Sequence, residues 1–201
     1  MDGVLIDAKD WHYESLNKAL ALFGFEISRY DHLVTYDGLP TMSKLDMLSM
    51  ERGLPVELHQ FINFVKQQYM MDEINVNCKP VFSHEYALAK LKSEGYKLAV
   101  CSNSIRKTVD VMLEKSKIID YFDVLISNQD VKRSKPDPEM YVTCMSKLSV
   151  TPQETLILED NEHGIKAALA SGAHLMRIEN LSDVNYFEIR KIIENIEEGI
   201  S

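Results

Sequence analysis

The sequence of 201 residues predicts an α/β fold, in which a parallel sheet carries an inserted all-helical subdomain. From about residue 81 onward, short apolar runs alternate with segments of helical periodicity, and this alternation is typical of a parallel sheet covered by helices. Residues 9–79 repeat their apolar positions at helical spacing and show no alternation of period two. We therefore expect an α/β core formed by residues 1–8 and 80–201, and a helical cap formed by residues 9–79.

The helical cap is expected to contain at least three helices. In the first, Leu16, Leu20 and Phe23 share one face, and Gly24 provides the stop. Further helices are expected at about residues 41–51 and 56–73. Each of these follows a break that contains glycine and proline, Asp37–Pro40 and Arg52–Pro55.

The elements of the core are indicated by their ends and by their apolar runs. Ser83 and Gly95 flank the first core helix as cap and stop. Asp137 followed by Pro138 opens another helix, and Gly172 ends a third. The helices are expected at about residues 84–94, 105–116, 138–148, 163–170 and 184–197. The strands are expected at residues 97–101, 123–126, 155–158 and 174–178.

Charge and composition limit the partners of the chain. A net charge of −9 argues against binding to nucleic acid or to an anionic membrane, because both require a basic surface. No apolar run approaches the ~20 residues of a membrane span, and no signal peptide is visible. Three cysteines that match no metal spacing favour a reducing compartment. We expect a cytoplasmic protein that is a monomer or weak homodimer, with Cys101 as a core residue rather than a nucleophile.

Four short segments carry candidate chemistry. The first is MDGVLIDA at residues 1–8. The others are a strand that ends at Ser102, a proline-bounded turn that contains Lys135, and a strand that ends in the paired carboxylates Glu159 and Asp160. Because ligands bind at the carboxyl ends of the strands in an open α/β sheet, we expect these groups to converge.

Taken in this order, the four segments resemble the motifs of the haloacid dehalogenase (HAD) superfamily of phosphotransferases, over nearly the whole chain. The most similar branch is that of the β-phosphoglucomutase-like enzymes with a helical cap. The resemblance implies a Rossmann-like core, phosphoryl transfer through an aspartyl-phosphate intermediate, and Mg²⁺ as the cofactor. It also implies a small phosphorylated substrate, for which sugar phosphates are the family's common choice.

The resemblance assigns the metal and the phosphate to separate residues. Asp160 would bind Mg²⁺ directly, Glu159 would assist, and the backbone carbonyl of Asp2 would join them. The alternative for the acid pair is a position at a helix N-terminus, where it would offset the helix dipole. Lys135 would neutralise the phosphate and the attacking carboxylate, and the alternative is a solvated surface lysine.

Ser102 and the backbone of Asn103 would, by the same resemblance, donate hydrogen bonds to phosphate oxygens. The alternative for Ser102 is an N-cap for the following helix, a duty that Ser104 fits better. His12 would help to position the acid/base from the first cap helix, with a surface histidine as the alternative. Thr41, Lys44 and Arg106 are candidates for substrate contact, and for each of these the alternative is an ordinary surface residue.

The first motif is incomplete. In the family motif D-x-D-G, the first Asp is the nucleophile and the second is the general acid/base. Met1 occupies the x position, so Asp2 would be the acid/base, and the nucleophile would precede Met1. A misplaced start codon is the plainer explanation, and a non-catalytic relative that binds a phosphoryl ligand is the alternative. The chain as written is expected to be inactive. In the family, a strand leads into the first motif, and strands 97–101 and 155–158 are expected to flank the place of that strand.

Departures from the mutase pattern favour hydrolysis over isomerisation. The Thr that mutases carry after Asp7 is Ala8 here, and the Lys that follows their motif Ser is not found after Ser102. The cap Arg that grips a distal phosphate has no clear match near residues 38–44. We therefore expect a Mg²⁺-dependent phosphatase, with a phosphosugar mutase as the alternative.

Overall fold

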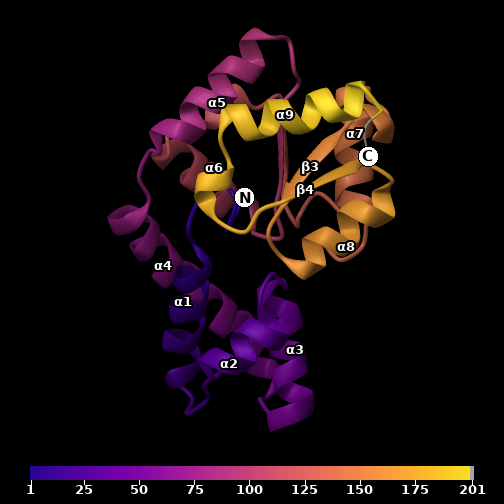
Figure 1. The fold of residues 1–201 in the computed structure, drawn as a ribbon. Helices are drawn as coiled ribbons and strands as arrows, with labels where there is room; N and C mark the ends of the chain where they lie inside the picture. The colour runs from indigo at the N-terminus through magenta and orange to yellow at the C-terminus, as the bar shows by residue number, and fades with distance from the viewer. Residues whose placement is uncertain (200–201) are drawn as a thin grey trace. The chain divides into compact units, whose positions relative to one another are not determined.

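The chain folds as two compact units in the computed structural model, which describes residues 1–199. The α/β unit combines Met1–Asp7 with the chain from Lys79 onward, and the helical unit contains Ala8–Cys78. Figure 1 shows all labelled strands in the first unit, whereas the second is built from helices alone. The parallel strands and the helical insertion confirm the fold class predicted from the sequence.

The helical unit is built on three long helices. They are α1 (Lys9–Ala21), α3 (Thr41–Arg52) and α4 (His59–Asn77). Between the first two lie a short helix α2 (Arg29–Asp31) and a π-helical turn (His32–Tyr36), and a 3₁₀ turn (Val56–Leu58) leads into α4. Gly53 ends α3 with a φ of 69°, a left-handed conformation that glycine adopts without steric cost.

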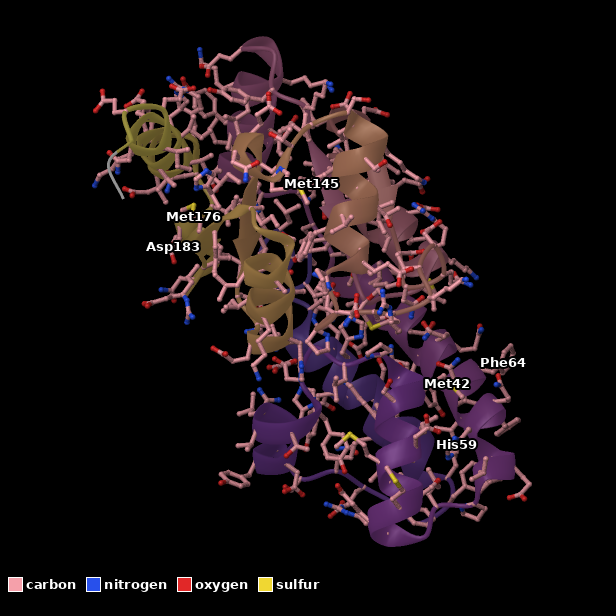
Figure 2. All side chains as sticks on the ribbon, turned by 90° about the vertical axis from the view of Figure 1, so that its right-hand side faces the viewer. Met42, His59, Phe64, Met145, Met176 and Asp183 are labelled. Carbon is pink, nitrogen blue, oxygen red and sulfur yellow. The ribbon has the colours of Figure 1, made fainter. Side chains whose placement is uncertain are left out.

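Aliphatic side chains one helical turn apart form the core of this unit. Leu16 and Leu20 of α1, Leu45 and Leu48 of α3, and Ile62 of α4 are buried together. In Figure 2, Phe64 of α4 points away from the unit, and it is 61% exposed. The helical spacing found in the sequence therefore marks the buried faces of these helices.

The α/β unit alternates helices and strands along the chain. Its strands are β1 (Ala99–Cys101), β2 (Val124–Ile126), β3 (Leu156–Glu159) and β4 (His174–Arg177). Its helices are α5 (Phe82–Ser93), α6 (Arg106–Lys115), α7 (Glu139–Leu148), α8 (Glu162–Ser171) and α9 (Tyr186–Glu197). Within residues 1–199, no helix has the length and apolar character that crossing a bilayer requires.

The sheet consists of two separate parallel pairs. β1 pairs with β2, so that Val100 lies beside Leu125, and β3 pairs with β4, so that Ile157 lies beside Leu175. Among the described residues, β1 and β3 are not paired with each other, as the sequence analysis expected. α7 packs on β1 and β2, and α8 packs on β3 and β4 (Figure 1).

The N-terminal segment forms a tight loop inside the α/β unit. Gly3 has a φ of 74°, its N–H donates to the Ile6 carbonyl at 2.8 Å, and the Leu5 N–H donates to the Met1 carbonyl at 2.8 Å. The imidazole of His84 on α5 lies 3.1 Å from the Leu5 carbonyl oxygen and 3.0 Å from that of Leu181. These contacts fix Asp2, the second residue of the chain, in a defined position in the unit.

One histidine of the helical unit is buried in a way that disfavours its charged form. His32 is 2% exposed, and its ring centroid lies 4.9 Å from that of Tyr13. Burial, reinforced by the positive charge of Lys44, lowers the pKa of His32 from 6.5 to about 4, although the nearby carboxylate of Asp37 opposes the shift. The folded protein therefore keeps this imidazole neutral at pH values where the unfolded chain protonates it.

We predict that His32 makes the protein sensitive to mild acid. As the pH falls below 6.5, the unfolded chain binds a proton that the folded chain refuses, so the free energy of unfolding decreases until about pH 4. At pH 5 this loss is about 2 kcal/mol. Urea unfolding at pH 7 and pH 5 should show this loss in the parent and in a His174→Gln control. His32→Gln should lack it, and an equal loss in that variant would contradict the prediction.

Candidate functional site

The predicted phosphate residues gather at the carboxyl ends of β1 and β3. Ser102 follows β1, Glu159 ends β3, and Lys135 lies in the loop between β2 and α7. The ammonium group of Lys135 donates to the Cys101 carbonyl at 3.0 Å and forms an ion pair with Glu159. Residues separated by 24 and 34 positions in the sequence thus meet at one point of the sheet.

The Lys135–Glu159 pair is buried. Lys135 is 7% exposed and Glu159 is 4% exposed. The hydroxyl of Tyr141 on α7 donates a hydrogen bond to the same carboxylate oxygen, and the Lys135 ammonium lies 5.1 Å from the centroid of the Tyr141 ring. Removing one member of a buried pair leaves an uncompensated charge and costs about 3–5 kcal/mol, so each member holds the other in place.

The protonation states of Glu159 and Tyr141 follow from their contacts. Burial alone would raise the pKa of Glu159, but the Lys135 ammonium, the N-terminal amine and the hydrogen bonds outweigh it and hold the pKa below its usual value. Burial and the negative charge of Glu159 raise the pKa of Tyr141 well above its usual range. At neutral pH the group therefore contains an ionised carboxylate and a neutral phenol that donates to it.

Asn103 fixes the loop that carries Lys135. Its side-chain amide donates to the Lys135 carbonyl at 3.1 Å, and its side-chain oxygen accepts from the Lys135 N–H at 3.1 Å. This two-way pairing joins the end of β1 to a turn 32 residues further along the chain. The side chain of Asn103 therefore positions Lys135, a role that the sequence analysis did not assign.

Two serines connect β1 to the N-terminal loop. The Ser102 hydroxyl is buried and accepts from the Ser104 N–H at 3.1 Å, and the Ser104 hydroxyl donates to the Asp2 carboxylate at 3.2 Å. Helix α6 begins at Arg106 after Ile105 and has no side-chain cap, so neither serine takes the capping role that was the alternative. Ser102 is thus linked to Asp2 through Ser104, and the next residue, Asn103, is linked to Lys135.

The paired carboxylates at the end of β3 have different surroundings. Asn161 caps α8 by accepting from the His163 N–H at 2.9 Å, so the cap of that helix is not one of the acids. Glu159 is engaged by Lys135 and Tyr141, so it also positions the lysine, and its assisting role at a metal stays a prediction. Asp160 follows directly and leads into the α8 cap.

The oxygen donors near the strand ends are of the type that Mg²⁺ prefers. In the described residues 1–199, no three His, Cys, Asp or Glu side chains are grouped as a metal site. Mg²⁺, however, is usually held by one or two carboxylates, with waters and phosphate oxygens completing its shell. Asp160 and Asp2 are hard oxygen donors of this type, so the residues present fit Mg²⁺ better than a metal that requires a closed protein cage.

The predicted substrate contacts belong to both units. The guanidinium of Arg106 donates to the Leu125 carbonyl at 2.8 Å and to Asp130 at 2.6 Å, and its role in substrate contact stays a prediction. His12, Thr41 and Lys44 belong to the helical unit. There the His12 ring lies 3.2 Å from the Lys66 ammonium, Thr41 begins α3, and Lys44 is 5% exposed. Their roles in substrate contact stay predictions.

Cys101 is confirmed as a core residue. It packs against the buried residues under α7 and α8, and its thiol lies 3.8 Å from the Met140 carbonyl oxygen. A hydrogen bond with Cys144 and burial raise the pKa of the Cys101 thiol well above its usual value. The thiol therefore stays protonated and unreactive, because a nucleophile must be a thiolate. None of the three cysteines, all of which are described, forms a disulfide.

Gly164 is a site residue that the sequence analysis passed over. A Cβ atom at this position would lie 2.2 Å from the carboxyl carbon of Glu159, far inside van der Waals contact. A glycine inside the first turn of a helix, where no cap requires it, is the signal that could have indicated such a close approach. Tyr141 offered no comparable signal, because an aromatic residue on a helix most often belongs to the core.

Comparison with known proteins finds similar sequences and structures over most of the chain. A family model described as "Haloacid dehalogenase-like hydrolase" matches residues 1–178. A phosphorylated carbohydrates phosphatase from Thermotoga maritima is 26% identical over 178 residues, covering 86% of this chain and 79% of that protein. A pyrophosphatase, PpaX, from Oceanobacillus iheyensis is 27% identical over 213 residues, covering 100% and 92%. The crystal structure of a β-phosphoglucomutase from Clostridium difficile has the same fold, with a TM-score of 0.85, 24% identity, and coverage of 99% and 95%.

We predict that Gly164→Ala destabilises the protein, although alanine favours a helix by up to about 1 kcal/mol over glycine. The added Cβ would displace the Glu159 carboxylate, and such overpacking costs about 1–3 kcal/mol. Chemical denaturation of the single variants and of Gly164→Ala/Glu159→Ala would test this. If the carboxylate is the cause, the double variant should lose less stability than the two single losses added together. If the stability losses of the two single variants simply add, the clash is not with the Glu159 carboxylate.

Proposed function

We propose, from the premise that this chain belongs to the haloacid dehalogenase-like hydrolase family, that its α/β unit supports hydrolysis of a small phosphate monoester. The observation that carries the proposal is the buried Lys135–Glu159 pair at the strand ends, with the backbone of Lys135 held by Asn103. The favoured substrate class is a sugar phosphate, and the relative named for phosphorylated carbohydrates supports it.

Lys135 supplies the positive charge that phosphoryl transfer requires. The transferred group carries negative charge on its oxygens, and catalysis consists largely of positioning and charge neutralisation. The Cys101 carbonyl, Glu159 and Tyr141 hold the ammonium group in one place, so it needs no reorganisation when the charge develops. The buried Ser102 hydroxyl would donate to a phosphate oxygen.

Asp2 is the general acid and base of the proposed reaction. Its carboxylate accepts a hydrogen bond from Ser104, which orients it in the N-terminal loop. It would protonate the leaving oxygen of the substrate and later remove a proton from the attacking water. Family resemblance places the phosphate-accepting carboxylate two residues ahead of Asp2, so the assay requires that residue. The assay protein, called here the extended protein, carries an apolar strand ending in Phe-Asp directly ahead of Met1.

Mg²⁺ is the cofactor that we propose for this site. When bound, it would neutralise phosphate oxygens and bring the substrate into line with its acceptor. Asp160 and the Asp2 backbone carbonyl would hold it. Glu159, which also keeps Lys135 in place, would assist them.

We predict that Lys135→Met in the extended protein lowers kcat by about 10²–10³-fold, the usual cost of a lost electrostatic stabiliser. Phosphate release from p-nitrophenyl phosphate measures the rate, and Lys97→Met is the control, because Lys97 is an exposed lysine that donates to the Leu148 carbonyl. Because the single variant leaves Glu159 without its partner, Lys135→Met/Glu159→Gln is assayed beside it. A folded double variant that keeps its rate within tenfold of the parent would contradict the role of Lys135.

We predict that Asp160→Asn removes Mg²⁺-dependent hydrolysis from the extended protein and leaves its fold intact. Loss of groups that merely support metal ligands costs about 10–100-fold, and a direct ligand should cost at least as much. The rate is measured during a Mg²⁺ titration, with circular dichroism as the folding check and Asp120→Asn, an exposed acid, as the control. If the activity in excess EDTA stays close to that of the parent, Mg²⁺ is not the cofactor. If a sugar phosphate is isomerised without release of phosphate, the mutase alternative is favoured.

A further inference from the structure

His84 is a buried side chain of the α/β unit that the proposed reaction does not use. It lies in the first turn of α5 and is 1% exposed. The two segments that its ring contacts, one at Leu5 and one at Leu181, belong to the same unit. Because buried polar groups are almost always hydrogen-bonded, these contacts indicate what the ring does.

Each ring nitrogen of His84 faces a backbone carbonyl. Nδ1 lies 3.1 Å from the Leu5 oxygen, and Nε2 lies 3.0 Å from the Leu181 oxygen. Carbonyl oxygens only accept hydrogen bonds, and imidazole has an N–H at one nitrogen when it is neutral and at both when it is protonated. The ring therefore donates to at least one of two segments that lie 79 and 97 positions from it in the sequence.

The Leu5 contact reaches the loop that carries Asp2. Backbone hydrogen bonds close residues 1–6 on themselves, and three N–H groups of this range donate to the Met1 carbonyl at distances of 2.8 and 3.2 Å. A segment that is bonded to itself in this way moves as one piece. A displacement at Leu5 is therefore passed on to Asp2.

The carboxylate of Asp2 is supported in two ways. Ser104 donates to it directly at 3.2 Å, and this bond orients the carboxylate group. His84 acts one step further away, because it holds the Leu5 carbonyl and with it the loop from which the Asp2 side chain extends. The first contact sets the rotation of the side chain, and the second sets the position of its backbone.

The Leu181 contact gives the ring a firm support. Leu181 begins a 3₁₀ turn that ends at Asp183, which Figure 2 labels, and the Asp183 carboxylate accepts from the Asn180 N–H at 2.8 Å. α9 follows this turn and packs against α5, the helix that carries His84. Nε2 therefore meets a braced carbonyl, and Nδ1 is turned toward the loop of Asp2.

We propose that His84 is a positioning residue for the general acid and base: its Nδ1–H donates to the Leu5 carbonyl and holds the loop so that the Asp2 carboxylate reaches the substrate oxygen. The catalytic part of this inference rests on the proposed function, in which Asp2 transfers the protons. His84 acts through Leu5 and needs no contact with the substrate. A displacement of about 1 Å can cost about a hundredfold in rate, so such a backbone contact affects kcat measurably.

Two conservative variants separate the two contacts of His84. The amide nitrogen of an asparagine side chain takes the place of Nδ1, and that of a glutamine side chain takes the place of Nε2. His84→Asn therefore keeps a donor for Leu5, whereas His84→Gln keeps a donor for Leu181. Each variant is the control for the loss of packing in the other.

The hold on the loop is tested in the 201-residue chain by NMR, as amide hydrogen exchange at Gly3 and Leu5, whose N–H groups are hydrogen-bonded inside the loop. We expect exchange at these amides to be at least about tenfold faster in His84→Gln than in His84→Asn, because local opening needs less free energy when an outside contact is lost. Ile165 on α8 is the reference amide and should exchange alike in both. Equal exchange at Gly3 and Leu5 in the two variants would overturn the proposal.

The parent chain tests the same contact without a substitution. ¹⁵N NMR of the His84 ring shows which nitrogen carries hydrogen, because the protonated and bare states of a ring nitrogen differ widely in chemical shift. A hydrogen on Nδ1 at the pH of the assay supports the proposal. A ring with hydrogen on Nε2 alone donates only to Leu181, and that result would overturn the proposal even if a variant fails to fold.

The effect on catalysis is measured in the extended protein with p-nitrophenyl phosphate and Mg²⁺. His84→Gln should lower kcat by about 10–100-fold and change KM by less than about twofold, since the groups that hold the phosphate stay in place. His84→Asn should keep kcat within about threefold of the parent, because its amide still donates to Leu5. Equal losses of kcat in the two variants would reduce His84 to a support of the fold.

The two measurements distinguish this inference from the proposed function. Faster exchange in His84→Gln together with an inactive parent would support the hold of His84 on the loop and count against the proposed phosphatase activity. An active parent whose kcat is unchanged in both variants would support that activity and overturn the positioning role of His84.

Discussion

The buried ion pair between Lys135 and Glu159 is the constraint on which the rest of the site depends. Burial of either charge alone would be costly, so the fold must bring both strand ends and the Lys135 loop to one point. Asn103 holds that loop through its backbone, and Gly164 leaves the space that the carboxylate occupies. The positive charge proposed to meet a phosphate is therefore fixed by the fold before any ligand binds.

The division of the sheet into two pairs is the second feature with consequences for function. Among the described residues, β1 and β3 each have one parallel partner, and residues of both strands line an apolar cavity. Ser102 and Glu159 stand at the carboxyl ends of these same strands. The ion pair between Lys135 and Glu159, together with the hydrogen bond from Lys135 to the Cys101 carbonyl, therefore joins the ends of two strands that belong to different pairs.

Much of the fold could be predicted, because periodicity and end signals are local. The strand expected at 123–126 is observed as Val124–Ile126, and the helix expected at 41–51 is observed as Thr41–Arg52. The contacts within the site could not be predicted in the same way. Arg106 binds Asp130 and the Leu125 carbonyl, and no local pattern encodes a pairing with residues 24 and 19 positions away. The pairing of Glu159 with Lys135, 24 positions apart, was likewise not indicated by the sequence.

The sequence by itself determined the class of fold and the order of its elements, because periodicity and end signals are local, and its motifs at the strand ends resemble those of the family whose model matches residues 1–178. Only the tertiary structure decided which groups touch. It paired Glu159 with Lys135 and Tyr141, it turned the Asn103 amide to the backbone of Lys135, and it placed Gly164 against a carboxylate. The physical reason is that propensity and periodicity act over a few residues. Burial of charge and close packing, by contrast, join residues that are distant in the chain, and their partners are fixed only when the core closes.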